Sequence, residues 1–312
     1  MHFILEPAAE EFLVYDVKEK PRDVITVAKW LDKNTLDIVT PSLIAPHPNT
    51  YTYSKRLAES LVAEEVENIP VSIIRPSIVI PAVEEPLPGW VDSLNGPVGL
   101  IVGAGKGVIR SMHCKGENRG QFIPVDYAVN TGIVVAYLIG TGQVKSKEMP
   151  VYNLTQDVLL QLTYREILNL GRTISHEYPF EMQIWYPDGD MRSSKLVHNI
   201  YSIFFHWLPA ILIDFIMILC GQKTFMIRIQ KKIYNGLELL DFFSTREWYF
   251  KSEKFLALNE YLTEEDKKVF QMSDFLKFPL EEYLTTALLG TRQYCLKEDL
   301  SSLPRCRQKQ KM

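Results

Sequence analysis

Tyr51 and Lys55 are the residues of this chain whose types and spacing could best support catalysis. They lie four positions apart in the run NTYTYSK at residues 49–55. On an α-helix this spacing places both side chains on one face, about one turn apart. An ammonium group beside a phenol favours the phenolate and so lowers the pKa of the phenol. Such a tyrosine can give a proton to a carbonyl oxygen as a hydride reaches the carbonyl carbon, while the lysine donates hydrogen bonds to ribose hydroxyls of a nicotinamide cofactor.

The residues around this pair predict the elements that would position it. Residues 48–50 form a turn and N-cap signal, and residues 55–67 carry apolar side chains at helical spacing. Residues 69–80 are a β-branched run typical of a buried parallel strand, with a loop opening at 75–77. In a doubly wound sheet, ligands bind at the carboxyl ends of the strands. The order helix, strand, loop therefore favours a nucleotide site, although an isolated Tyr-x-x-x-Lys match is more often an exposed lysine on a helix.

Several stretches together resemble one known family. The runs NTYTYSKRLAE at 49–59 and IIRPSIV at 73–79 are similar to extended short-chain dehydrogenases/reductases. More narrowly, they resemble the alcohol-forming fatty acyl-CoA reductases of the insect or male-sterility type. Further similar stretches lie at 97–114, 123–126, 150–155, 207–210, 246–248 and 283–297. They follow the family's order over nearly the whole chain.

The resemblance implies an α/β fold, namely the C-terminal part of a doubly wound, Rossmann-like parallel sheet followed by a mainly α-helical domain. We expect a partial NADP-binding reductase domain at 1–165, a helical fatty acyl-CoA reductase C-terminal domain at 178–303 and a basic tail at 304–312. Further predicted elements are a helix at 24–31 capped by Asp23, a short strand at 122–125, a helix at 127–138 capped by Asp126, and a last strand at 151–154.

The Gly-rich turn with which family members begin is not found ahead of Tyr51. In the family this turn lets backbone amides and a helix N-terminus approach the cofactor pyrophosphate. The first glycine of this chain is Gly89. The family's catalytic serine or threonine, placed well ahead of the tyrosine, has no counterpart either, because residues 1–10 do not match that strand and Ser42 lies in a Pro-rich turn close to Tyr51. We therefore expect a reductase that lacks the N-terminal Gly-rich half.

The function implied by the resemblance is the NADPH-dependent reduction of a long-chain acyl-CoA to a primary fatty alcohol. Tyr51 would be the proton donor, Lys55 its partner and a ribose ligand, and Pro76 a backbone contact beside the nicotinamide. Without the Gly-rich turn, this chain by itself is expected to be inactive. Two alternatives stay open: a non-catalytic lipid- or membrane-associated relative, and another extended short-chain enzyme acting on a steroid or a nucleotide sugar.

The glycines at 103–107, in the run GAGKG, are suggestive of a phosphate loop. A P-loop, however, requires Ser or Thr directly after Gly-Lys, and Gly107 stands there. We expect instead a turn that shapes the substrate cleft. Lys106 and Arg110 could then meet phosphates of coenzyme A, or simply be solvated charges on a loop.

Composition excludes several other classes. The formal charge of −4 argues against nucleic acid as a partner. The four cysteines have no metal-binding spacing and the six histidines are scattered, so no metal is expected and the thiols indicate a reducing, intracellular compartment. Residues 1–20 contain acidic side chains throughout and do not read as a signal peptide.

Residues 200–220 raise the question of a membrane. The segment is long enough to span a bilayer but contains His206, Pro209 and Asp214. We expect a buried or membrane-surface hairpin, with a full span as the alternative. The resemblance implies association with the endoplasmic reticulum or peroxisome, although the hydrophobic C-terminal anchor of family members is not matched in this sequence.

Overall fold

The computed structural model describes residues 8–9, 11, 14–15, 18–144, 149–156, 161–273 and 279–311. Its strands are β1 (Ala8–Ala9), β2 (Ile73–Pro76), β3 (Ile78–Ile80), β4 (Ser111–His113), β5 (Phe122–Pro124), β6 (Val151–Leu154), β7 (Asp190–Arg192) and β8 (Tyr249–Phe250). Its helices are α1 (Pro21–Trp30), α2 (Lys33–Ile44), α3 (Thr50–Ala63), α4 (Pro97–Gly105), α5 (Val125–Gly140), α6 (Tyr164–Glu177), α7 (Lys195–Ser202), α8 (Leu208–Leu219), α9 (Met226–Ser244), α10 (Glu253–Ala257), α11 (Glu264–Val269), α12 (Leu280–Gly290) and α13 (Leu303–Gln310), with short turns of other helix types between them.

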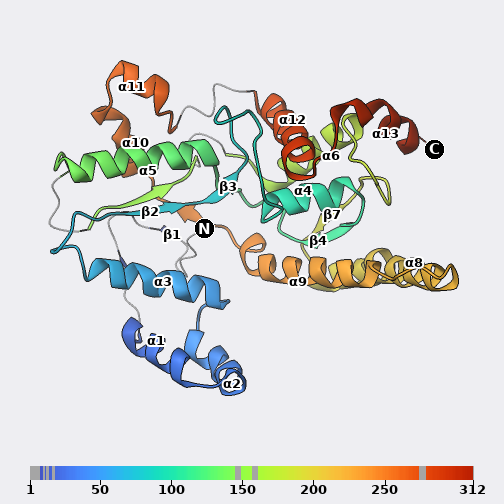
Figure 1. Ribbon diagram of the computed structural model, residues 1–312, viewed down its shortest axis with the longest axis horizontal. Helices are drawn as coiled ribbons and strands as arrows, with labels where there is room; N and C mark the ends of the chain where they lie inside the picture. Colours follow the sequence, from blue (N-terminus) through green and yellow to red (C-terminus); the bar gives the residue numbers. More distant parts are fainter. Residues whose placement is uncertain are drawn as a thin grey trace.

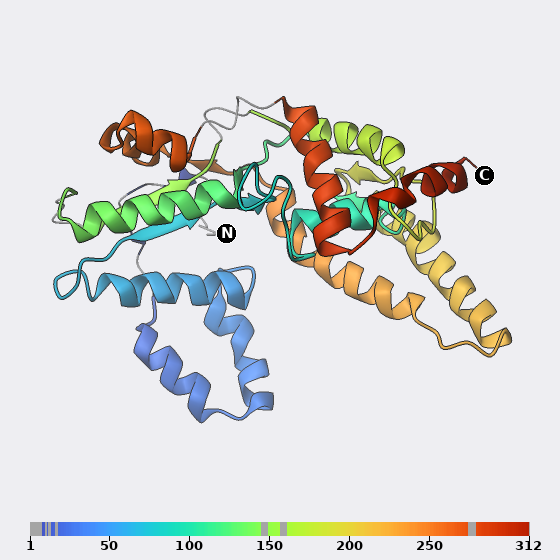
Figure 2. The ribbon, with the colours of Figure 1, turned by 45° about the horizontal axis from the view of Figure 1, so that its top comes forward.

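The strands pair in parallel, which confirms the predicted α/β class. β2 pairs with β6, β3 with β5, β4 with β7 and β1 with β8. Helix α5 lies on one face of the β2–β6 pair and α3 on the other (Figures 1 and 2). Accordingly, Ile73 packs with side chains of the α3 face, while Ile74 packs against the cluster under α5. Among the described residues, β2 is hydrogen-bonded to a strand on one side only.

The strand predicted at 69–80 is divided in two. It forms β2 and β3, which have different partners, and Ser77 stands between them. The N–H of Ser77 donates to the carbonyl of Leu154, whereas the N–H of Ile78 donates to the carbonyl of Gln121. The chain changes neighbour at this point. Pro76, directly before it, has no N–H to continue the first ladder.

The predicted helix after the N-cap signal is confirmed as α3. Asn49 begins it, with its side-chain oxygen accepting the N–H of Thr52 at 2.9 Å. The helix ends at Ala63, earlier than predicted, and turns follow. The expected cap at Asp23 was wrong, since α1 begins at Pro21 and Asp23 lies within its first turn. A proline at the first helical position needs no donor and is already in helical geometry.

Asp126 does not cap its own helix as predicted. It lies in the first turn of α5, and one carboxylate oxygen accepts the backbone N–H groups of Val83, Glu84 and Glu85, at 2.9–3.2 Å. The carboxylate is 7% exposed. Asp126 therefore fixes the loop that follows β3 onto the start of α5.

The glycine run at 103–107 is mostly helix and only partly the expected turn, although Ala104 and Gly105 do line the cavity described below. Most of it forms the end of α4, and Gly107 follows with a φ of +73°. A Cβ on Gly103 would lie 2.5 Å from the side chain of Ile109, and one on Gly105 would lie 2.6 Å from the ring of Phe180. These glycines permit close packing against α4. The run is therefore rich in glycine for packing, and it does not form a phosphate loop.

A buried ion pair joins α3 to β2. Arg75 donates from Nε and Nη2 to the two carboxylate oxygens of Glu59, at 2.9 and 2.7 Å. Arg75 is 1% and Glu59 6% exposed. A bidentate pair of this kind fixes both distance and orientation. It sets the position of α3 along β2.

The segment 200–220 forms the first half of a helical hairpin, and α9 forms the second half. A hairpin was one of the two arrangements expected for this segment. The continuous helical stretch Lys195–Leu219 is long and apolar enough to cross a membrane by length and composition. Within it, however, Asp214 turns inward: its carboxylate accepts the N–H groups of Phe225, Met226 and Ile227 at the start of α9, at 2.9–3.0 Å. The acidic residue thus closes the hairpin.

His206 attaches this hairpin to β4. Its Nε2 accepts the backbone N–H of Arg110 at 2.8 Å and that of Ser111 at 3.1 Å. Both bonds require the neutral imidazole to accept at Nε2. Burial, and then the nearby His198 and Arg110, lower the pKa of His206 to about 4.

Replacing Glu59 by Gln should lower the free energy of unfolding by about 3 kcal/mol, because it removes the charge of one partner of a buried bidentate ion pair. Urea titration followed by circular dichroism measures this. Glu64→Gln is the matched control on the neighbouring turn. Its partner Arg22 is exposed, so the loss there should stay below about 1 kcal/mol. Equal losses of unfolding free energy in the two variants would show that the buried ion pair stabilises the fold no more than the exposed one does.

Acidification should destabilise the fold through His206. Between its unfolded pKa of roughly 6.5 and the folded value of about 4, the unfolded chain binds a proton that the folded chain does not. Stability from this group is therefore present above pH 6.5 and falls as the pH drops to 4, by at most about 3 kcal/mol. His206→Gln can still accept an N–H but cannot titrate, so unfolding titrations at pH 7 and pH 4.5 should differ less for this variant than for the parent. The same pH dependence in both proteins would contradict the assignment.

Candidate active site

Tyr51 and Lys55 lie together on the first turns of α3. The Lys55 ammonium is 5.8 Å from the centroid of the Tyr51 ring, and both side chains are exposed, Tyr51 by 46%. The predicted shared face is therefore confirmed, and Tyr51 is not part of the apolar core. Tyr53, by contrast, is 6% exposed and packs beneath the helix with Leu57.

The Glu59–Arg75 ion pair fixes the position of the Tyr51–Lys55 face relative to the sheet. Tyr51, Lys55 and Glu59 follow one another at intervals of four residues, so they lie along one stripe of α3. Glu59, at the far end of the stripe, contacts Arg75 of β2. Helix α3 runs opposite to β2, so its N-terminal end lies at the end where β2 finishes (Figure 1). Tyr51 is consequently placed toward the carboxyl end of the strand, where ligands bind in such sheets.

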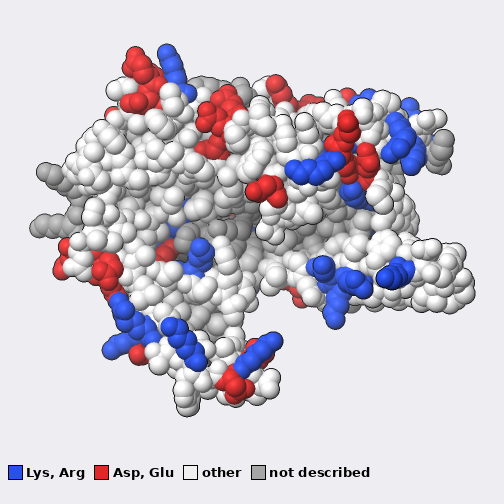
Figure 3. Space-filling view, in the orientation of Figure 1, with Lys and Arg blue, Asp and Glu red and all other residues white. Residues whose placement is uncertain are grey.

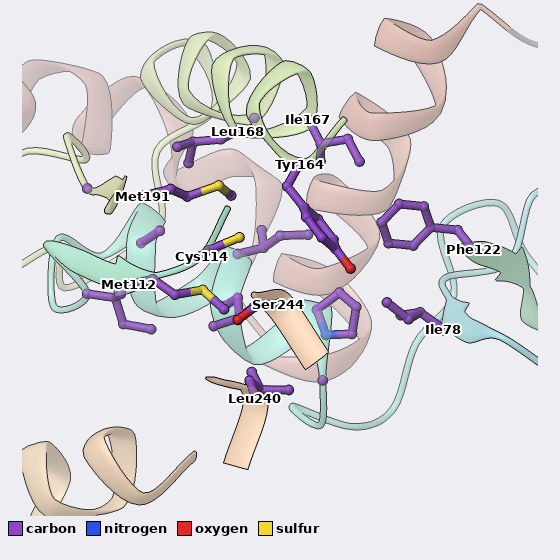
Figure 4. Close-up of a pocket in the computed structure, with 18 of the residues that line it drawn as sticks. Ile78, Met112, Cys114, Phe122, Tyr164, Ile167, Leu168, Met191, Leu240 and Ser244 are labelled. Atoms are coloured by element: carbon purple, nitrogen blue, oxygen red, sulfur yellow. The ribbon is translucent and has the colours of Figure 1, made fainter. Parts of the chain in front are cut away.

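A cavity of about 260 Å³ opens directly after β2. Ser77, the residue after Pro76, lines it together with Ile78. In Figure 4, Ile78 and Phe122 form one end, Met112, Cys114 and Met191 form the other, and Tyr164, Ile167 and Leu168 of α6 cover the space between them. The cavity is thus elongated. Its end at Ser77 belongs to the loop that was predicted to bind the cofactor.

The cavity walls are almost entirely apolar. Burial raises the pKa of the Cys114 thiol to about 12 and also raises the pKa of the Tyr164 phenol, so both groups are neutral. Aliphatic, aromatic and thioether side chains supply most of the remaining surface, and the polar residues Gln121, Arg172, Ser175, Asp190 and Ser244 contribute little of it. A cavity of this shape and polarity fits a hydrocarbon chain.

One polar atom in the cavity lacks a partner. The hydroxyl of Ser77 is buried, with the residue 3% exposed, and it makes no hydrogen bond to any residue that the structure describes. Buried hydroxyl groups are normally paired, because leaving one unpaired costs about 1–3 kcal/mol. Ser77 is therefore positioned to bond a polar atom at the head of a chain lying in the cavity.

The predicted site residues divide into two groups. Tyr51 and Lys55 are adjacent, and Pro76 ends β2 immediately before the cavity. The alternative that Lys106 and Arg110 are solvated loop charges was wrong, whereas their contact with coenzyme A phosphates stays a prediction. Lys106 is bound to Glu298 at 2.8 Å and to the carbonyl of Glu181, while Arg110 donates to the carbonyl of Tyr186 and stacks over Trp185. Among the described residues, no group of three or more His, Cys, Asp or Glu side chains is placed to hold a metal ion.

Sequence reasoning missed the cavity. Its residues come from segments far apart in the chain, so no local motif contains them. One signal was present. The α6 residues that line it recur at helical spacing: Tyr164, Ile167, Leu168, Gly171, Arg172 and Ser175. That stripe indicates a buried helix face but not what the face covers.

Comparison with known proteins identifies the family. Two family models, both described as male sterility protein, match residues 7–132 and 205–298. The chain belongs to the male sterility protein family. Fatty acyl-CoA reductase 2 of Mus musculus is 35% identical over 297 residues, which cover 95% of this chain and 57% of the mouse protein. Fatty acyl-CoA reductase 1 of Xenopus laevis is 33% identical over 297 residues, with the same two coverages. Fatty acyl-CoA reductase wat of Drosophila melanogaster is 34% identical over 278 residues, covering 89% and 53%.

This family member spans little more than half the length of the curated relatives it matches. The match at residues 7–132 is to a nicotinamide-binding family model, and it contains Tyr51, Lys55 and Pro76. The matched region at 205–298 includes α8, α9 and α12, the predominantly helical part.

Replacing Ser77 by Ala should weaken binding of a long-chain alcohol about fivefold, since one hydrogen bond is worth roughly 1 kcal/mol. Binding of 1-fluorodecane, which cannot replace that bond, should stay unchanged, while decanol binding falls. Quenching of Trp248, which lines the cavity, provides the measurement. Because the hydroxyl has no partner in the empty cavity, Ser77→Ala should be at least as stable as the parent.

Leu168→Trp serves as the control for this experiment. The larger ring fills the cavity and should reduce binding of both ligands equally. An equal loss of both ligands in Ser77→Ala would instead indicate a packing role for the serine.

Proposed function

We propose that this chain carries the proton-donor, ribose-binding and acyl-binding parts of an NADPH-dependent fatty acyl-CoA reductase. The observation that carries the proposal is the apolar cavity that begins at Ser77, one residue after Pro76 and at the end of β2 where the N-terminal end of α3 also lies. The relatives named as fatty acyl-CoA reductases support the substrate class. NADPH rather than NADH as the cofactor is part of the proposal.

The proposed chemistry uses few groups of this chain. The acyl chain lies in the cavity, with its thioester carbonyl at the Ser77 end. Tyr51 donates a proton to the carbonyl oxygen as hydride from the bound cofactor reaches the carbon. Lys55 keeps the phenol poised and donates to the ribose, and the backbone at Pro76 borders the nicotinamide. The hemithioacetal formed first would lose coenzyme A as the free thiol to give the aldehyde. A hydride from a second NADPH and a second proton would then reduce the aldehyde to the alcohol.

The boundaries at 1–165 and 178–303 remain part of this proposal. The cavity draws walls from both ranges, with α4, β4 and β5 from the first and β7 and α9 from the second. Helix α6 lies across the boundary between them. Binding of the acyl chain would therefore depend on both parts.

A non-catalytic lipid-binding relative is the second candidate, favoured by the apolar cavity, which could hold a lipid without any reaction. Charge-assisted contacts to a phosphate are worth about 1.5–3 kcal/mol each, and no Gly-rich turn precedes Tyr51 to supply them, so the 312-residue chain should bind NADPH weakly and show no measurable turnover. The third alternative was an enzyme acting on a steroid or a nucleotide sugar. A nucleotide sugar suits this cavity poorly because its walls offer few polar partners, whereas a steroid would match their polarity. Saturable micromolar NADPH binding by the chain alone would require another phosphate site.

We also propose association with an intracellular membrane, of the endoplasmic reticulum or peroxisome. The family resemblance and the one apolar helical stretch long enough to cross a bilayer support this proposal.

The decisive experiment joins the N-terminal segment of mouse fatty acyl-CoA reductase 2 to this chain and measures fatty alcohol formed from acyl-CoA and NADPH. Tyr51→Phe should lower the rate at least 100-fold, as expected for loss of a general acid. Lys55→Met should in addition weaken NADPH binding. Tyr53→Phe is the matched control, because Tyr53 is buried beneath α3 and should leave the rate unchanged.

The outcomes separate the candidates. A fusion that binds acyl-CoA but forms no alcohol favours the lipid-binding relative. Activity that survives Tyr51→Phe removes the tyrosine from the reaction, and failure of acyl ligands to bind at all refutes the assignment of the cavity.

A further inference from the structure

The outer face of the α8–α9 hairpin is apolar and uncovered. We refer to α8, α9 and the turn between them as the arm. On α8 and the turn before it, the exposed side chains recur at helical spacing: Phe204, Leu208, Ile211, Leu212, Phe215, Ile216 and Leu219. Their exposed fractions lie between 45% and 71%. No described element packs on this stripe. A stripe of this width on a soluble protein marks a surface that another apolar medium covers.

The arm projects from the body of the molecule. Both ribbon views show α8 and α9 extending together beyond the other elements, with the turn between them at the tip (Figures 1 and 2). The exposed apolar residues continue through the tip, where Leu219 and Phe225 are 71% and 43% exposed. The apolar stripe is therefore accessible to an extended flat surface as well as to a small partner.

The exposed charges on the outer part of the arm, residues 208–237, all have one sign, whereas Glu238 and Asp241 near its base are bound to Lys195. Lys223, Arg228, Lys231 and Lys232 are exposed. From residue 200 to 237 the only acidic residue is Asp214, and it is 4% exposed and bound to the start of α9. The whole chain, by contrast, has a net charge of −4. In Figure 3 the arm shows basic side chains along an otherwise uncharged surface.

Asp214 also determines how the arm can meet a membrane. Its three hydrogen bonds to the N-terminus of α9 exist only while α8 folds back on α9. A straight span of 195–219 would break them and place a bare carboxylate among lipid tails. The folded hairpin instead keeps the carboxylate inside and turns the apolar stripe outward.

We propose that the arm binds the surface of an anionic lipid bilayer, with the apolar stripe of α8 at the boundary between headgroups and acyl chains and the four basic residues at the headgroups. This geometry is that of an interfacial amphipathic helix. Basic residues near the surface of an anionic leaflet add to the binding. The proposal does not depend on reductase activity, and it specifies the surface and the lipid chemistry of the membrane association proposed above.

The experiment uses Cys220, which is exposed at the end of α8. In a Cys295→Ser background, an environment-sensitive fluorophore is attached to Cys220; Cys114 and Cys306 are buried. Vesicles of phosphatidylcholine alone and with 30% phosphatidylserine are titrated. We expect a blue shift and an intensity increase, with at least tenfold tighter binding to the anionic vesicles and a loss of this preference at high salt. Co-sedimentation of the unlabelled protein with the same vesicles provides an independent measurement.

Two variants and a matched control test the apolar and the electrostatic contributions to membrane binding separately. Phe215→Glu with Leu219→Glu should reduce binding to both kinds of vesicle at least tenfold. Lys231→Glu with Lys232→Glu should remove only the preference for anionic lipid. The control is Val129→Glu with Ile133→Glu, which alters an equally exposed apolar stripe on α5 and should leave vesicle binding unchanged.

Two results would overturn the proposal. One is the absence of any spectral change or co-sedimentation with anionic vesicles while the labelled protein stays folded by circular dichroism. The other is a concentration-dependent dimer, seen by analytical ultracentrifugation without lipid, that the Phe215 and Leu219 variant abolishes. That result would assign the stripe to a second copy of the chain.

Discussion

The placement of the candidate active site depends on the buried ion pair between Glu59 and Arg75. Burying two charges is costly, and the pair is tolerated because the guanidinium and carboxylate meet in a bidentate geometry. That geometry fixes α3 lengthwise against β2. Since Tyr51 and Lys55 precede Glu59 along the same helical stripe, the pair also determines where their polar ends lie. Only about two turns of α3 separate Glu59, which makes the structural contact, from Tyr51, the proposed proton donor.

The cavity extends this arrangement into the second part of the chain. Its near end is the residue after β2, and its walls are completed by α6, β7 and α9. A nucleotide-binding sheet alone would offer a strand end and a loop. Here the parallel pairing of β4 with β7 brings a strand from each part together, so that a long apolar space lies directly beyond the cofactor loop. This contact between the two parts forms the apolar space in which an acyl chain is proposed to bind.

The same physical rule governs the arm. A carboxylate within an apolar helix must find hydrogen-bond donors, and Asp214 finds them at the exposed start of α9. The hydrogen bonds to the Asp214 carboxylate hold α8 folded back against α9. The apolar residues of α8 that have no place inside the hairpin then face outward. One inward-facing acid therefore explains both the hairpin and its uncovered stripe.

Local features of the chain could be predicted from its sequence because they depend on neighbouring residues. Asn49 and the pattern after it identified α3, and the spacing of Tyr51 and Lys55 on that helix gave their shared face. β-Branched residues identified the strands at 73–80 and 151–154. The strong match of several separated motifs identified the family.

Other features depended on partners distant in the chain, and only the tertiary structure decided them. The split of the strand at Ser77 follows from which neighbour each half meets, and the glycines of α4 are explained by Ile109 and Phe180 pressing against them. Asp126 accepts the neighbouring N–H of Tyr127, but its other donors, like those of Asp214, lie outside its own helix. A local cap was therefore the wrong expectation for Asp126, and these distant contacts could not be predicted from spacing. The cavity is the clearest case, because its residues share no sequence pattern except on α6. Contacts between distant segments are set by packing and by the need to satisfy buried polar groups, which periodicity along the chain does not specify.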